Sequence, residues 1–198
     1  LGDVYKRQDN TFLEELKLLC KQNGSLLIVD EIQSGYGRTG KFFAHQYAQF
    51  EPDLITIAKG MGNGFPIGGI LIHPDIKPWS GMLGTTFGGH HLACAAGLAV
   101  LEVIDSEGLI DHVNSIGKVL WNALRSLENL IQIRGRGLMI GFDLKEDSKL
   151  FRASLLKDHY VFVGSAMQSN TIRLLPPLGV SKEELVFFLQ AFKKVWYA

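Results

Sequence analysis

Two short apolar runs, each ending in a charged residue, constrain the fold of this chain more than any other feature. Residues 26–29 form the first run, which leads into Asp30, and residues 54–58 form the second, which leads into Lys59. A glycine-rich loop and a short helical pattern separate the two runs. A connection of that length favours a βαβ unit, in which two buried strands run parallel. We therefore expect Asp30 and Lys59 at the same edge of one sheet.

The rest of the pattern predicts an α/β protein with two domains, covering residues 1–105 and 106–198. Capping boxes are expected to open helices at Thr11–Glu14 and at Ser181–Glu184. The remaining expected elements are a helix over 93–104 that is buried on several sides, an amphipathic helix over 109–127, a helix over 148–157, a strand over 68–72, a hairpin over 131–144, and strands over 160–163 and 171–174.

Composition excludes several classes of protein. The 198 residues carry 20 Lys and Arg against 20 Asp and Glu, so there is no basic excess for nucleic acid or for a membrane surface. The apolar runs fall far short of the roughly 20 residues that span a bilayer. Cys20 and Cys94 have no metal-ligand spacing, which favours a reducing, cytoplasmic setting. The chain lacks an initiator Met, and we expect residues 1–8 to be non-native sequence on a truncated protein.

The glycine loop resembles a phosphate-binding loop only superficially. Residues 35–41 satisfy the GxxxxGK part of that motif, but Phe42 stands where a Ser or Thr must hold Mg²⁺. The acidic strand also precedes the loop in the same unit, which would place carboxylates against the phosphates. The sequence therefore argues against a nucleoside triphosphatase.

Lys59 and Asp30 suggest a different chemistry. Burying a lysine ammonium is costly unless it is paired or reacts, and partial desolvation leaves a nucleophilic amine suited to a Schiff base. Gly60, Gly62 and Gly64 would let a flat cofactor lie against bare backbone. An aspartate nearby could keep a pyridine nitrogen protonated. Taken alone, Asp30 would more often be a helix cap or part of an ion pair.

Several ordered motifs resemble those of class III pyridoxal-phosphate (PLP) aminotransferases, and within them the acetylornithine aminotransferase group. The resemblance covers residues 11–198 and rests on LIVDEIQSGYGRTG at 27–40, PD at 52–53, AKG at 58–60, GTTFGG at 84–89, RGRGLM at 134–139 and RLLPP at 173–177. It implies fold type I, with the C-terminal part of the large PLP-binding domain in 1–105 and the small α+β domain in 106–198.

The resemblance also implies roles for individual residues. Lys59 would form the Schiff base with PLP and then carry protons, Asp30 would hold the pyridinium nitrogen, and Gln33 would contact the ring oxygen. Thr86 would reach the phosphate bound by the other subunit of a homodimer. The guanidinium of Arg173 would bind a carboxylate of the substrate, and Thr85 would also contact the substrate.

Other polar residues receive no catalytic role at this stage. Arg38 is left unassigned, Arg134 and Arg136 are expected to tie the small domain together, and His90 and His91 are expected to act as capping or interface residues. No metal site is expected.

The implied reaction moves an amino group from N-acetylornithine to a 2-oxo acid, 2-oxoglutarate being the first choice, as a step of arginine biosynthesis. Succinylornithine, ornithine and other ω-amino acids remain as alternative donors. An aminomutase of the same fold and a catalytically inactive dimerising partner remain as alternative functions. Members of the resembling family are about twice this length, so we expect the 198-residue chain alone to be inactive.

Overall fold

The computed structural model describes residues 10–128 and 130–197. These residues divide into two compact units. Unit 1 contains residues 10–37 and 41–109, and unit 2 contains residues 38–40 together with the described residues from 110 onward. Across the described ranges, no helix combines the length and the apolar character needed to cross a membrane.

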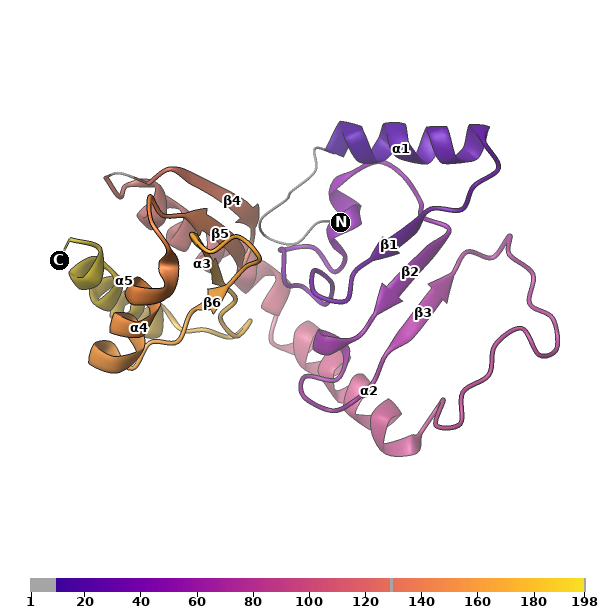
Figure 1. The fold of residues 1–198 in the computed structure, drawn as a ribbon. Helices are drawn as coiled ribbons and strands as arrows, with labels where there is room; N and C mark the ends of the chain where they lie inside the picture. The colour runs from indigo at the N-terminus through magenta and orange to yellow at the C-terminus, as the bar shows by residue number, and fades with distance from the viewer. Residues whose placement is uncertain (1–9, 129, 198) are drawn as a thin grey trace. The chain divides into compact units, whose positions relative to one another are not determined.

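Unit 1 is built on a three-stranded sheet in the order β1-β2-β3 (Figure 1). Strand β1 (Ile28–Asp30) runs parallel to β2 (Leu54–Ile57), which confirms the parallel pair expected from the sequence. Strand β3 (Gly69–Ile72) is antiparallel to β2. The register pairs Asp30 with Thr56, so the chain after both parallel strands emerges at one edge of the sheet.

Two α-helices and two 3-10 turns complete unit 1. They are α1 (Asn10–Gln22), η1 (Ala44–Tyr47), η2 (Lys59–Met61) and α2 (His91–Ser106). Helix α1 already includes Asn10, so Thr11 lies inside the helix and the predicted capping box at Thr11–Glu14 is wrong. The helix ends at Gln22, and Gly24 just beyond it adopts a left-handed conformation with φ +63°.

The predicted burial of the first strand and of the helix over 93–104 is also wrong. In β1 only Val29 is buried, and Ile28 is 59% exposed. Helix α2 buries only Ala93, Gly97 and Ile104, while large apolar residues such as Leu92 stay exposed. An apolar pattern reports which surfaces gain from leaving water, but burial needs a partner element, and the described chain supplies one for only part of these faces.

Unit 2 contains a four-stranded antiparallel sheet in the order β4-β5-β7-β6. The strands are β4 (Gln132–Arg136), β5 (Met139–Asp143), β6 (Gly164–Ser165) and β7 (Thr171–Leu174). The hairpin and the strand at 171–174 are confirmed. The strand predicted over 160–163 is wrong, because Tyr160 ends the preceding helix in a left-handed conformation and pairing starts only at Gly164.

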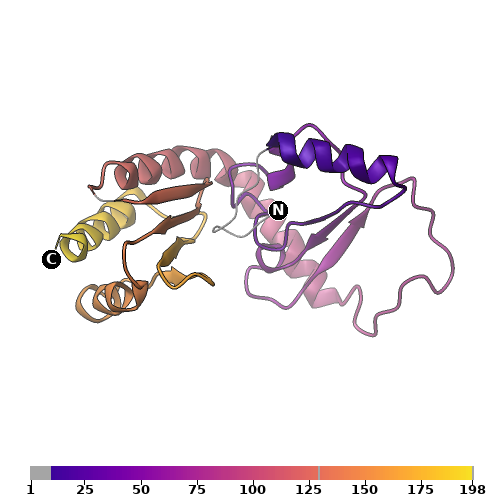
Figure 2. The same ribbon diagram turned by 45° about the horizontal axis from the view of Figure 1, so that its top comes forward.

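Three helices pack against this sheet (Figure 2). They are α3 (Leu109–Arg125), α4 (Ser148–His159) and α5 (Lys182–Trp196). The capping box at the start of α5 is confirmed, since Glu184 N donates to Ser181 Oγ at 3.1 Å and Ser181 N donates to Glu184 Oε2 at 2.8 Å. The core collects fully buried side chains from the sheet and all three helices, among them Val113, Leu124, Ile140, Phe142, Leu155, Ile172 and Phe192.

Candidate active site

Asp30 closes β1 with its carboxylate held in a defined orientation. Its Oδ1 accepts hydrogen bonds from Ile32 N at 2.9 Å and from Thr56 Oγ1 at 3.1 Å. The residue itself is exposed. The carboxylate is therefore fixed by two donors on one oxygen and remains accessible to a ligand.

Lys59 lies one residue beyond the end of β2, after Ala58, and opens η2. Its backbone has φ +44°, in the left-handed region that side chains other than glycine seldom adopt. Strain of this kind is concentrated at functional sites. The predicted desolvation of Lys59 is wrong, because the residue is exposed among the described residues.

At two of the three glycines after Lys59, the space beside the backbone is occupied by other residues of the chain. A Cβ on Gly60 would lie 3.2 Å from Tyr36 Cβ, and one on Gly62 would lie 2.3 Å from Phe65 O. Only Gly64 faces open space. The predicted bare-backbone platform is therefore wrong at Gly60 and Gly62, because the chain itself fills both positions.

Gln33 is half-buried in the turn that follows β1, and a buried carboxylate organises that turn. Glu31 accepts hydrogen bonds from Ser34 Oγ, from Ala44 N at 3.0 Å and from His45 N at 2.7 Å, and its Oε1 lies 3.0 Å from His45 Nδ1. Burial disfavours the charged form of Glu31, but these hydrogen bonds outweigh it and hold its pKa below the ordinary value. The carboxylate thereby ties the Gln33 turn to η1.

Thr85 and Thr86 lie in the long connection between β3 and α2, which contains turns but no helix or strand. Figure 1 shows this connection extending away from the three strands. Both threonines are exposed. They are accessible to a ligand, and nothing in unit 1 itself selects a role for either of them.

Arg173 lies in the middle of β7, between two glycines on the neighbouring strands. It pairs with Gly141 of β5 and with Gly164 of β6. A Cβ on Gly164 would approach Arg173 Cβ at 3.4 Å and Nε at 3.5 Å. Because neither glycine has a side chain, there is space along the sheet surface for the Arg173 side chain.

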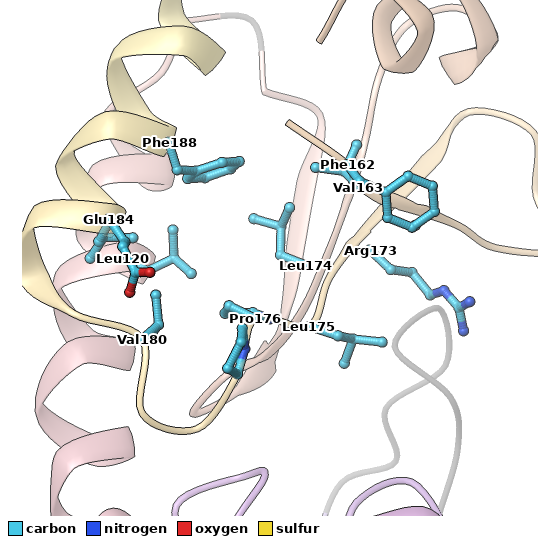
Figure 3. Close-up of a pocket in the computed structure, with 13 residues that line it drawn as sticks. Leu120, Phe162, Val163, Arg173, Leu174, Leu175, Pro176, Val180, Glu184 and Phe188 are labelled. Atoms are coloured by element: carbon cyan, nitrogen blue, oxygen red, sulfur yellow. The ribbon is translucent and has the colours of Figure 1, made fainter. Parts of the chain in front are cut away.

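A pocket of about 380 Å³ lies beside Arg173 in unit 2. Figure 3 shows Leu174, Val180 and Phe188 turned toward this pocket, whereas the Arg173 side chain extends away from it. Adjacent residues of a strand face opposite sides of a sheet, which explains why Leu174 and Arg173 point in different directions. Arg173 is among the residues that line the pocket, but its guanidinium does not point toward the apolar side chains there.

Arg38, unassigned from the sequence, joins the segment that follows Arg173. Its Nη1 donates to Pro176 O, and its own carbonyl accepts from Leu138 N at 3.1 Å. Gly137 has φ +54°, and a Cβ there would lie 2.6 Å from the carbonyl carbon of Thr39. Burial lowers the Arg38 pKa through desolvation. Arg38 is thus a structural residue of unit 2.

Arg134 also has the structural role that the sequence suggested. Its Nη1 donates to Asp143 Oδ2 at 2.7 Å and its Nη2 to Oδ1 at 2.8 Å, and Thr171 Oγ1 donates to Oδ1 at 2.6 Å. Burial opposes ionisation of Asp143, but the bonds from Arg134 and Thr171 outweigh it and lower its pKa. This network crosses from β4 through β5 to β7.

The histidines at the start of α2 show no functional cluster. His90 occupies the N-cap position, but its side chain makes no capping hydrogen bond, so the predicted capping role is wrong for this residue. Within residues 10–128 and 130–197, no three His, Cys, Asp or Glu side chains come together in a group suited to a metal ion.

Comparison with known proteins decides the family. The sequence model described as aminotransferase class-III matches residues 2–196. The chain belongs to the class-III aminotransferases. Acetylornithine aminotransferase 1 of Bordetella pertussis is 42% identical over 185 residues, covering 89% of this chain and 46% of that protein. Acetylornithine aminotransferase of Oceanobacillus iheyensis is 39% identical over 193 residues, covering 94% and 48%. This aminotransferase chain spans about half the length of the curated relatives it matches.

Solved aminotransferase structures share its fold. Ornithine aminotransferase from Toxoplasma gondii is 30% identical with a TM-score of 0.84, covering 93% of this chain and 46% of that chain. Acetylornithine aminotransferase from Elizabethkingia anophelis is 28% identical with a TM-score of 0.81, covering 96% and 50%. The prediction of an α/β chain of fold type I is confirmed, and so is the resemblance to PLP-dependent class-III aminotransferases.

The described residues of this chain fit PLP in their donor chemistry. A carboxylate and a primary amine follow adjacent parallel strands of one sheet, the place where open α/β sheets bind ligands. The Asp30 carboxylate is fixed through one oxygen, and the Lys59 amine is exposed. Sequence reasoning missed Thr56, because aligning the two predicted strand ends would pair Asp30 with Lys59, whereas the register pairs Asp30 with Thr56.

Proposed function

We propose that this chain supplies catalytic residues of a PLP-dependent transaminase that moves an amino group between N-acetylornithine and 2-oxoglutarate. The observation that carries the proposal is the placement of Asp30 and Lys59 after adjacent parallel strands in a chain of the class-III family. Acetylornithine is favoured as the donor because relatives with that name match at about 40% identity. We also propose a role in arginine biosynthesis and a cytoplasmic location.

The cofactor would be held by residues of unit 1. PLP, when bound, supplies an aldehyde and an electron-accepting ring. Lys59 would hold the aldehyde carbon through its amine and, once released, would move a proton at the substrate α-carbon. Asp30 would keep the ring nitrogen protonated through its carboxylate, and Gln33 would donate to the ring oxygen. Thr86 would donate its hydroxyl to the phosphate in a homodimer.

The substrate would be held by Arg173, with Thr85 as a second contact. A guanidinium binds a carboxylate through two parallel hydrogen bonds, which fixes the orientation of the bound acid. Gly141 and Gly164, which pair with Arg173, leave space for its side chain to extend along the sheet. We also propose that residues 1–105 belong to the large cofactor domain and residues 106–198 to the small domain.

The test uses the protein made from its complete reading frame, with PLP added. Titration with PLP should give a visible absorption band that borohydride removes. Lys59→Ala should abolish that band, whereas Lys157→Ala, at an exposed position of α4, should leave it unchanged. A Lys59→Ala protein that keeps the band would show that another amine holds the cofactor and would overturn the assignment.

The reaction itself is tested by its substrates. Amino transfer from N-acetylornithine should require 2-oxoglutarate, and turnover without any oxo acid would indicate an aminomutase instead. We also propose that the 198-residue chain alone is inactive, since it spans 46% of the Bordetella relative and leaves Lys59 uncovered. Measurable amino transfer by the purified 198-residue chain would contradict that second proposal.

A further inference from the structure

Thr56 and Asp30 occupy opposite positions on two parallel strands. The register of β1 and β2 pairs their Cα atoms, and the Thr56 hydroxyl donates to Asp30 Oδ1 at 3.1 Å. The backbone reinforces the pairing, because Glu31 N donates to Thr56 O at 3.0 Å. Thr56 lies in β2 and precedes Lys59, the first residue of η2, by three positions.

Both hydrogen bonds to the Asp30 carboxylate fall on the same oxygen. Ile32 N approaches Oδ1 at 2.9 Å from the following turn, and Thr56 Oγ1 approaches it from the neighbouring strand. Two donors from different directions stop the carboxylate from rotating about its χ2 torsion, which is otherwise broad. The second oxygen, Oδ2, is then presented in a fixed direction.

We infer that Thr56 is a positioning residue for Asp30. Its hydroxyl orients the carboxylate so that Oδ2 meets the protonated ring nitrogen of PLP. This inference rests on the proposed function, since it needs a cofactor ring beside Asp30. Thr56 does not touch the reacting atoms and acts only through the carboxylate.

The experiment compares Thr56→Val with Thr56→Ser in the protein made from its complete reading frame. Valine keeps the β-branched shape and removes the hydroxyl, whereas serine keeps the hydroxyl and removes a methyl group. PLP affinity is measured by titration, and the pH dependence of the visible band is recorded for each variant. We expect Thr56→Val to weaken PLP binding on the order of tenfold, as for a lost hydrogen bond to a charged group. Thr56→Ser should stay close to the wild type.

A second comparison separates orientation from general packing. In an Asp30→Asn background, Thr56→Val should cause little further loss of PLP affinity, because the two residues act as one unit. Equal losses for the valine and serine variants, or a full additional loss in the Asp30→Asn background, would overturn the inference. Unchanged affinity in Thr56→Val would overturn it as well, while leaving the proposed function intact. A wild-type protein that binds no PLP would overturn both.

Discussion

Glu31 accepts hydrogen bonds from both the backbone N–H and the ring of His45, fourteen positions along the chain, and it does so while fully buried. Together with the bonds from Ser34 and Ala44, this makes Glu31 the anchor of the turn that carries Gln33. Asp30 is the exposed member of the acidic pair and Glu31 the buried one. The Glu31 carboxylate therefore supports the fold, whereas the Asp30 carboxylate stays accessible for the cofactor role that we propose.

Glu31→Gln should lower the free energy of unfolding at neutral pH by about 1–3 kcal/mol, because an amide cannot accept every hydrogen bond that the carboxylate accepts. The folded-state pKa of Glu31 lies below its ordinary value of 4.5, so the stability that it contributes is present above the unfolded pKa. That contribution is lost as the pH falls through the folded pKa. Denaturant unfolding at several pH values should show that the free energy of unfolding falls less steeply at acid pH in Glu31→Gln than in the wild type. The matched control is Glu15→Gln at an exposed position of α1, which should match the wild type.

Arg134→Met should destabilise unit 2 by about 3–5 kcal/mol, since it leaves the buried Asp143 carboxylate without its charge partner. Replacing both partners, as Arg134→Met with Asp143→Leu, should restore much of that loss. Thermal or denaturant unfolding of the two variants measures the difference. If the single variant is as stable as the double variant, the Arg134–Asp143 ion pair makes no specific contribution to the stability of unit 2.

Gly117→Ala should destabilise the protein although alanine is the better helix former by about 1 kcal/mol. A Cβ at this position of α3 would lie 2.7 Å from Gly137 O, so the helix could no longer approach the β4–β5 turn as closely. We expect a loss of about 1–3 kcal/mol, typical of overpacking. Gly179→Ala, where a Cβ meets nothing within 4 Å, is the control and should be neutral.

Arg38→Met should loosen the segment that follows Arg173. The substitution removes the donor to Pro176 O but keeps a long apolar stem in the buried site. Amide hydrogen exchange over residues 174–178 should become faster, with a stability loss of about 1–3 kcal/mol. Arg125→Met, at an exposed position at the end of α3, should leave the exchange unchanged. Unchanged exchange in Arg38→Met would mean that other contacts hold this segment.

Arg173→Lys should raise the KM for 2-oxoglutarate on the order of tenfold or more in the protein made from its complete reading frame. Lysine keeps the charge but cannot form two parallel hydrogen bonds with a carboxylate. The PLP absorption band should stay unchanged, because Arg173 is proposed to act on substrate alone. A changed band together with an unchanged KM would reverse the assignment.

The sequence by itself determined most of the local elements and which charged residues stand at the strand ends. The capping box of α5 and the apolar spacing of α3 are decided by neighbouring residues, so their hydrogen bonds and periodicity are visible in the sequence. The motifs around Asp30 and Lys59 also sufficed to predict the family that the comparisons show.

Only the tertiary structure decided which of these residues are buried and what they contact. Lys59 is exposed and Gly60 lies against Tyr36, because burial depends on elements that pack from elsewhere in the chain. The hydrogen bond from Thr56 to Asp30 and the one from Arg38 to Pro176 join residues 26 and 138 positions apart. No local pattern encodes such pairs, because strand register and loop packing are set by the whole unit at once.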